Sequence, residues 1–294
     1  MIRLASQVLA TSQSATAYRY RAHAKYDLGD NLGAIADYDQ AIAIDSNDAP
    51  SYSNRALAKS RLGDKKGAIA DCRQAIAIDP KNAATYAALA LVKYDMSDKL
   101  GAIAANSQAI AIDPKYASVY CDRGNAKSAL GDKRGAIADY DKAIAIDSKY
   151  ALAYYNRGTM RSALGDKRGA IADYDKAIAI DPKYAYAYNN RGNAKSALGD
   201  NRGAISDYDK TIAIDPKVAV AYHNLGAAKF NLGDMRGACR DHKKAVSLGS
   251  KLSSEYLMSD DGAWCLVPQY ALICFTCLAR CPASAMQPLR GGLL

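Results

Sequence analysis

The sequence predicts an all-α fold, a solenoid of seven repeats in which each repeat is a helix, a turn and a second helix. The main observation is a segment of the form L-G-D-x-x-G-A-I-A-D-Y-D-x-A-I-A-I-D-[PS], which recurs every 34 residues. Its last residue falls at Ser46, Pro80, Pro114, Ser148, Pro182 and Pro216, and Ser250 keeps the same spacing. Repeats of this length are typical of stacked helical units and not of one globular core.

The repeats divide the chain into four regions. A head at residues 1–14 comes before the seven repeats, which cover residues 15–252. The repeats are expected at 15–48, 49–82, 83–116, 117–150, 151–184, 185–218 and 219–252. A short capping helix is expected at 253–262, and an irregular tail that contains cysteines at 263–294. Below, each repeat is numbered from position 1 to position 34.

Two helices are expected in each repeat, and residues 117–150 illustrate them. Residues at intervals of three and four form one helical face in each half of this repeat. They are Tyr120, Gly124, Lys127 and Leu130 in the first half, and Ala136, Ile137, Tyr140, Ala143 and Ile144 in the second. Gly131 suits the left-handed conformation that ends a helix, and Asp132 can cap the next one. The first helix is therefore expected at 118–130.

Six positions of the repeat carry a specific pattern of aromatic, small and proline residues. In the fifth repeat they are Tyr154, Gly158, Ala170, Tyr174, Ala177 and Pro182. This pattern resembles the tetratricopeptide repeat, and the N-R-G-x-A-K and L-G-D motifs are similar to those of bacterial, particularly cyanobacterial, members. The resemblance implies a right-handed superhelix. A pentatricopeptide array, which reads RNA, is the nearest alternative, but its repeat is typically longer and lacks the Gly-Asp turn.

Two positions depart from the family pattern in a correlated way. Position 7 is Arg21, Arg55, Arg123, Arg157 and Arg191, and position 23 is Asp37, Asp71, Asp139, Asp173 and Asp207. The third repeat loses both, with Leu89 and Ala105 in their place. We expect each Arg to pair with the Asp of its own repeat, although the seventh repeat combines Leu225 with Asp241.

The third repeat is also the most degenerate of the seven. Ser97 replaces the turn glycine, and Asn106 replaces the aromatic residue at position 24. We therefore expect the third repeat to be the least stable joint in the stack.

The resemblance implies a groove lined by positions 2, 5, 6, 9, 12 and 13 of the first helices. Amide and acidic residues recur at positions 6 and 9, namely Asn54, Asp122, Asn125, Asn156, Asn190, Asn193 and Asn224. An amide offers both a donor and an acceptor, so a ladder of amides can hold the backbone of an extended peptide. Tyr155, Tyr186 and Phe230 would add apolar contact. The alternative is that these amides are only solvated surface residues.

The charge pattern favours a protein partner over a nucleic acid. The chain has 39 basic and 30 acidic residues with the two signs interspersed, whereas nucleic-acid proteins usually gather positive charge on one face. Binding of RNA by the Lys and Arg residues that recur at the repeat edges remains the alternative. In family members that recognise an acidic C-terminus, positions 2, 5 and 6 carry Lys and Arg, and among those positions only Arg19 is basic here, which disfavours such a partner.

No catalytic group, cofactor or small-molecule substrate is expected. The three histidines, His23, His223 and His242, are expected to lie far apart, and each aspartate recurs with the repeat as a cap or surface charge. No apolar run is long enough to span a membrane. The seven cysteines show no disulfide framework, which favours the cytoplasm.

The tail contains the one motif that suggests a metal. Cys274, Cys277 and Cys281 have the spacing of three ligands of a bacterial iron–sulfur motif, but Ala271 stands where the first ligand would be. A poorly ordered apolar tail, either a segment that docks on a partner or a reading-frame remnant, is the favoured interpretation, and an iron–sulfur or zinc site is the alternative.

Overall fold

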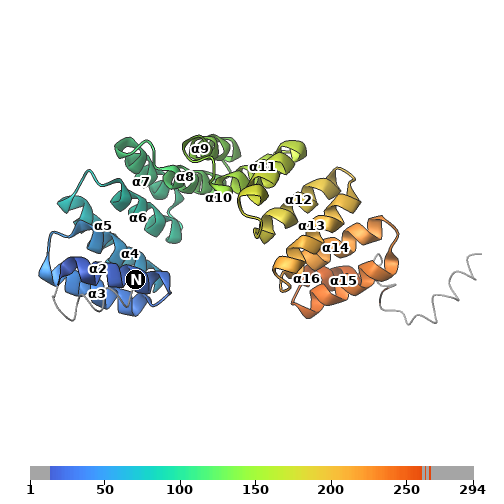
Figure 1. Ribbon diagram of the computed structural model, residues 1–294, viewed down its shortest axis with the longest axis horizontal. Helices are drawn as coiled ribbons and strands as arrows, with labels where there is room; N and C mark the ends of the chain where they lie inside the picture. Colours follow the sequence, from blue (N-terminus) through green and yellow to red (C-terminus); the bar gives the residue numbers. More distant parts are fainter. Residues whose placement is uncertain (1–13, 260–261, 263–264, 266–294) are drawn as a thin grey trace, which may run out of the picture. The chain divides into compact units, whose positions relative to one another are not determined.

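The computed structural model describes residues 14–259 together with residues 262 and 265, and this part of the chain contains helices and turns without strands (Figure 1). The first helices of the repeats are α2 (Ala15–Asp27), α4 (Ala49–Arg61), α6 (Ala83–Asp95), α8 (Ala117–Ala129), α10 (Ala151–Ala163), α12 (Ala185–Ala197) and α14 (Ala219–Asn231). The second helices are α3 (Asn31–Ile44), α5 (Lys65–Ile78), α7 (Lys99–Ile112), α9 (Lys133–Ile146), α11 (Lys167–Ile180), α13 (Asn201–Ile214) and α15 (Met235–Ser247). A last helix, α16 (Lys251–Met258), follows the seventh repeat. The all-α repeat fold is thus confirmed.

The turn inside each repeat is built by a Gly-Asp pair. Gly131 has a φ of 86°, a left-handed conformation that ends α8, and the Asp132 carboxylate accepts the N–H of Gly135 at 2.8 Å to cap α9. The same cap begins every second helix from α3 to α15. In the third repeat Ser97 holds the turn with a φ of 64°, the only positive φ of a non-glycine residue among those described.

The two helices of a repeat approach closely where a tyrosine meets a small residue. Tyr140 on α9 is 1% exposed, and a Cβ atom added to Gly124 on α8 would lie 2.7 Å from its ring. Tyr38, Tyr174 and Tyr208 are buried in the same way at position 24 of their repeats. This contact explains why position 8 accepts only Gly or Ala.

The joint between the second and third repeats is packed differently. Cys72 takes the place of the tyrosine at position 24, and Ala88 and Val92 of α6 pack against it together with Ala56 of α4. Helix α6 consequently packs against α4 more extensively than the other neighbouring first helices pack against each other.

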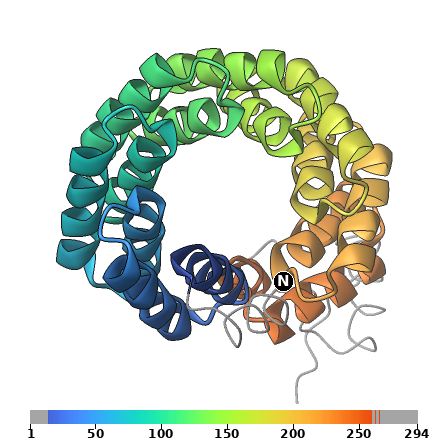
Figure 2. The ribbon, with the colours of Figure 1, turned by 60° about the vertical axis from the view of Figure 1, so that its left-hand side comes forward.

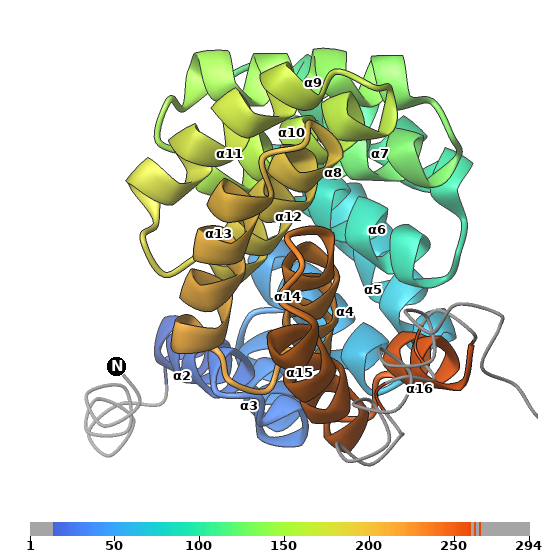
Figure 3. The ribbon, with the colours of Figure 1, turned by 90° about the vertical axis from the view of Figure 1, so that its right-hand side faces the viewer.

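The helices form two compact parts. The first, Met1–Pro182, contains α2 to α11, and its helices lie in two layers (Figure 2). The second, Lys183–Leu294, contains α12 to α16, with α13, α14 and α15 packed in sequence (Figure 3). In both parts the second helix of one repeat packs against the first helix of the next. No helix of the described residues is long and apolar enough to cross a membrane.

Helix α16 covers the end of the seventh repeat and corrects one expectation about the histidines. His223 of α14 and His242 of α15 belong to the same repeat, and their ring centroids are 5.2 Å apart. His242 also lies 4.3 Å from the ring of Tyr256 on α16. Burial lowers the pKa of His242 to about 4, so this histidine is neutral near pH 7. The pair is part of the packing under α16, because His242 stands at the position of the buried tyrosines.

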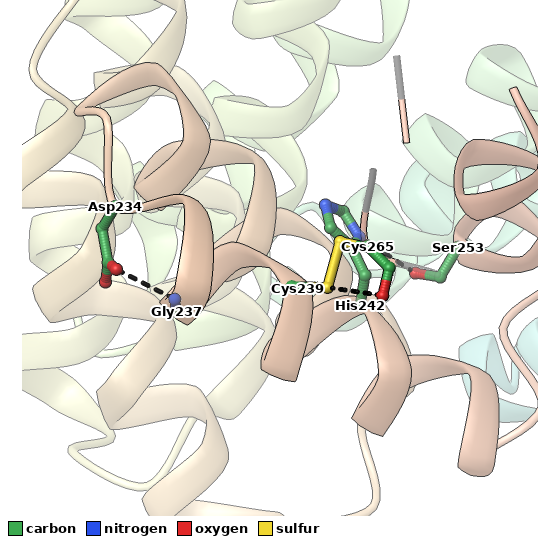
Figure 4. The surroundings of a disulfide bond; sticks show 6 residues. All are labelled: Asp234, Gly237, Cys239, His242, Ser253 and Cys265. Carbon is green, nitrogen blue, oxygen red and sulfur yellow. Dashed lines mark hydrogen bonds between the residues drawn. A yellow bond between two sulfur atoms is a disulfide. The ribbon is translucent and has the colours of Figure 1, made fainter. Parts of the chain in front are cut away.

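One pair of cysteines also differs from the expectation. Cys239 of α15 is disulfide-bonded to Cys265, beside His242 and Ser253 (Figure 4). Cys72 and Cys121 are buried thiols. A disulfide is the reverse of what a reducing compartment favours. The motif formed by Cys274, Cys277 and Cys281 lies outside the described residues.

Candidate functional site

Every repeat with Arg at position 7 contains an ion pair between its two helices. In the fourth repeat the Arg123 guanidinium donates from Nη2 to Asp139 at 2.6 Å and from Nε at 3.0 Å. The same two-bond contact joins Arg21 to Asp37, Arg55 to Asp71, Arg157 to Asp173 and Arg191 to Asp207. The predicted pairing is therefore confirmed. Each of these carboxylates is at most 7% exposed, so the pair is part of the core.

A second cation, at position 11, completes each of these contacts. Lys127 lies 2.8 Å from Asp139, for example. In the seventh repeat, where Leu225 replaces the arginine, Lys229 alone pairs with Asp241 at 2.6 Å. The exception noted in the sequence is thus explained, because the carboxylate needs one buried cation and normally has two.

The first helices of the third, fourth and fifth repeats surround a pocket of about 370 Å³. Helices α6, α8 and α10 form its walls, and residues of α7 and α9 contribute from the second layer. Four of the residues expected to bind a peptide line this pocket: Asp122, Asn125, Tyr155 and Asn156. The structure therefore brings together the central members of the predicted set.

The amides in this pocket bond to one another. The Asn125 Oδ1 atom accepts hydrogen bonds from the Tyr140 hydroxyl at 2.9 Å and from Asn156 Nδ2 at 3.0 Å. Asn156 Nδ2 also lies 3.6 Å from the Cys121 sulfur. The Nδ2 group of Asn156 thus donates to atoms of the protein itself, and its Oδ1 atom is the group that can accept a hydrogen bond from an N–H of a bound chain.

The C-terminal part repeats this arrangement. The Asn193 Oδ1 atom accepts from the Tyr208 hydroxyl at 2.8 Å and from Asn224 Nδ2 at 2.9 Å. Asn224 Nδ2 also lies 3.2 Å from the Oδ1 atom of Asn189, a buried amide that the sequence did not single out.

Three further predicted residues, besides Asn193 and Asn224, do not line the pocket. Asn54 is partly buried on α4, Asn190 accepts a hydrogen bond from Asn189 at 3.2 Å, and Tyr186 on α12 is 58% exposed. These residues occupy the expected helix positions. Their role in binding stays a prediction.

The sequence analysis missed three residues that shape the pocket. Tyr94 and Met160 line its walls, and Asn106 reaches it from α7. Asn106 is 2% exposed, and its Oδ1 atom is buried without a hydrogen-bond partner. A signal for Asn106 is present in the sequence, because Asn106, like Cys72 and His242, replaces the tyrosine at position 24.

Asp122 gives the pocket its charge. Its carboxylate forms no ion pair in the described part of the chain, whereas the two cations nearest to it in the sequence, Arg123 and Lys127, are both bound to Asp139. Burial raises the pKa of Asp122 to about 6. At neutral pH the pocket therefore holds a carboxylate with no positive partner. Among the described residues, no cluster of His, Cys, Asp or Glu has the number of ligands that a metal site needs.

Comparison with known proteins supports this description. Profiles described as TPR repeat match residues 22–63, 124–165, 160–199 and 192–233, and profiles described as tetratricopeptide repeat match residues 49–82 and 218–253. A search of curated protein sequences gives no significant match.

Three similar solved structures are those of MamA, of a tetratricopeptide repeat protein from Parabacteroides merdae, and of YrrB. YrrB is described as a TPR protein with an unusual peptide-binding site. MamA is 28% identical with a TM-score of 0.53, and the match covers 60% of this chain and 96% of MamA. The Parabacteroides protein is 20% identical with a TM-score of 0.59, covering 84% and 98%. YrrB is 21% identical with a TM-score of 0.51, and the match covers 63% of this chain and 96% of YrrB. With the family profiles matching more than half of its residues, the chain belongs to the tetratricopeptide repeat family.

Proposed function

We propose that this protein is a binding scaffold without catalytic activity, which holds an extended segment of a partner protein against the first helices of its repeats. The observation that carries the proposal is the pocket between α6, α8 and α10, where amide and carboxylate acceptors lie beside tyrosine side chains. An extended peptide offers one backbone N–H per residue and side chains that can enter such a pocket. The tetratricopeptide family and the peptide-binding site named for YrrB support the same assignment.

The distribution of cations argues against the RNA alternative at the first helices. Lys25, Lys59, Lys127 and Lys195 each pair with a buried carboxylate, and so do the arginines at position 7. Binding of a phosphate backbone depends on cations that can exchange their counterions for phosphates. Cations held in ion pairs of the core cannot supply that contact, so a protein segment fits this face better.

Site-specific photo-crosslinking tests the proposal. A photoreactive phenylalanine analogue replaces Tyr155 on α10 in one variant and Lys142, an exposed residue of α9, in a matched control. Each variant is irradiated in a lysate of the native host, and the adducts are identified by mass spectrometry. We expect a discrete protein adduct at position 155 that is absent at position 142. Equal adducts at both positions, or none at either, would contradict the proposal.

A further inference from the structure

The pocket lies where the third repeat lacks the tyrosine of the repeat pattern. In the first, fourth, fifth and sixth repeats the tyrosine at position 24 is at most 2% exposed and fills the space beside its first helix. Asn106 stands at this position in the third repeat and has a much shorter side chain. The space that a tyrosine ring would fill opens into the pocket between α6, α8 and α10.

Asn106 leaves an unused acceptor at this point. Its side chain is 2% exposed, it lines the pocket, and its Oδ1 atom has no hydrogen-bond partner. A buried acceptor without a donor costs about 1–3 kcal/mol, so native proteins rarely leave one unmatched.

Asp122 supplies a second acceptor with a full negative charge. Asn54, Asn156, Asn190 and Asn224 occupy the same position in other repeats, so the fourth repeat carries a carboxylate where the pattern has an amide. No cation of the described residues pairs with Asp122, and the neighbouring Arg123 is bound to Asp139. A half-buried carboxylate without a counter-ion attracts a cation from outside.

The walls of the pocket suit the rest of a basic side chain. Leu91 and Met160 give apolar surface for an aliphatic stem, and the rings of Tyr94 and Tyr155 lie beside the same space. A guanidinium or ammonium group is attracted by aromatic rings as well as by carboxylates. The charged group that lines this pocket without an ion pair, the Asp122 carboxylate, is an acceptor, and a cationic side chain is a pure donor.

We propose that this pocket binds a basic side chain, arginine in preference to lysine, of the peptide segment held by the first helices, with Asp122 as its acceptor. The proposal rests on the proposed function and names the chemistry of the partner at one position. Arginine is preferred because its planar group can donate two parallel hydrogen bonds to one carboxylate, and because it stacks on tyrosine rings.

Selection from a displayed library of random twelve-residue peptides tests the proposal with the whole protein as the target. We expect the selected peptides to share one basic residue and to bind at least about tenfold more weakly when it is replaced by glutamine. Asp122→Asn should weaken the parent peptides by a similar factor, and should have no further effect on the glutamine peptides. Asp122→Asn keeps the fold, because Asn is the usual residue at this position.

Two more variants complete the experiment. Asn106→Tyr should fill the pocket and abolish the preference for a basic residue. The fold accepts this tyrosine, because Tyr38 packs against Ala22 at position 8 of the first repeat and the third repeat has Ala90 at position 8. Asp45→Asn removes an exposed carboxylate after α3 and should leave affinity unchanged. The proposal would be overturned if the selected peptides shared no basic residue. It would also be overturned if the effects of Asp122→Asn and of the glutamine replacement in the peptide were additive. Either result would leave the scaffold function standing. If no peptide is selected at all, the scaffold function fails as well.

Discussion

The ion pair between Arg157 and Asp173 offers a quantitative test of how the two helices of a repeat are held together. Asp173 is 3% exposed and accepts two hydrogen bonds from Arg157 and one, at 3.0 Å, from Arg161. Asp173→Ala leaves both guanidinium groups without this partner, and removal of one member of a buried pair costs about 3 kcal/mol. Arg157 keeps only the half-exposed Asp141, at 2.7 Å.

The opposite change should cost less. Arg157→Leu leaves Asp173 with Arg161, which is the arrangement that the seventh repeat already has with Leu225, Lys229 and Asp241. We expect a cost of about 2 kcal/mol from the lost charged hydrogen bonds. The double variant has the apolar pair found in the third repeat, and should cost about 2 kcal/mol instead of the sum of about 5 kcal/mol.

Hydrogen exchange of the amides of α10 and α11, followed by mass spectrometry, is the suitable assay, because repeat arrays do not unfold in a single two-state step. Protection should fall about 150-fold for Asp173→Ala and about 30-fold for Arg157→Leu, at tenfold per 1.4 kcal/mol. The double variant should lose about 30-fold. A loss near the product, about 5,000-fold, would refute the pairing as the source of stability. Asp141→Ala, which removes an exposed partner of Arg157, should cost less than about 1 kcal/mol.

Four further changes test other features of the structure. Ser97→Gly should raise the melting temperature by relieving about 1 kcal/mol of left-handed strain, and an unchanged or lower value would argue against that strain. Gly192→Ala should destabilise the protein in urea by about 1–2 kcal/mol, since its Cβ would lie 2.7 Å from the ring of Tyr208; a gain would show that this packing is loose. Asp122→Asn should stabilise the protein by about 1 kcal/mol at pH 7 and by nothing at pH 4. The pKa of Asp122 is about 6 in the folded state and 3.8 in the unfolded state, so its charged form opposes folding only as the pH rises above the unfolded value. Thiol labelling without reductant should leave Cys239 unmodified, and labelling of this residue would contradict the disulfide.

The fold could be predicted in detail because the information is local and is repeated. The first helix of the fourth repeat was expected at 118–130 and is Ala117–Ala129, and the Gly-Asp turn caps the next helix as expected. The pairing of position 7 with position 23 could also be inferred, because both residues vanish together in the third repeat. Correlated differences between repeats replace the comparison of homologues that a single sequence lacks.

The site could be predicted only in part. Helix periodicity placed Asp122, Asn125 and Asn156 on one face, but the hydrogen bond from Asn156 to Asn125 depends on the spacing between α8 and α10. The lack of a cation beside Asp122 is a property of the surroundings, since Arg123 follows it directly in the sequence. The expectation that the histidines lie far apart is wrong for His223 and His242. Both belong to the seventh repeat, where their helices pack against each other.

The third repeat shows how the same substitutions can be read in two ways. From the sequence, the loss of the position 7 and 23 ion pair, the serine turn and Asn106 together predict the weakest joint of the stack. In the structure Asn106 also lines the pocket between α6, α8 and α10, and its Oδ1 atom is buried without a hydrogen-bond partner. A repeat that only drifted would be expected to fill this space with an apolar residue, because an unpaired buried amide is more costly than a methyl group. A polar residue there, lining the same pocket as the one acidic residue at position 6 of the repeats, fits a repeat whose stability has been given up for binding.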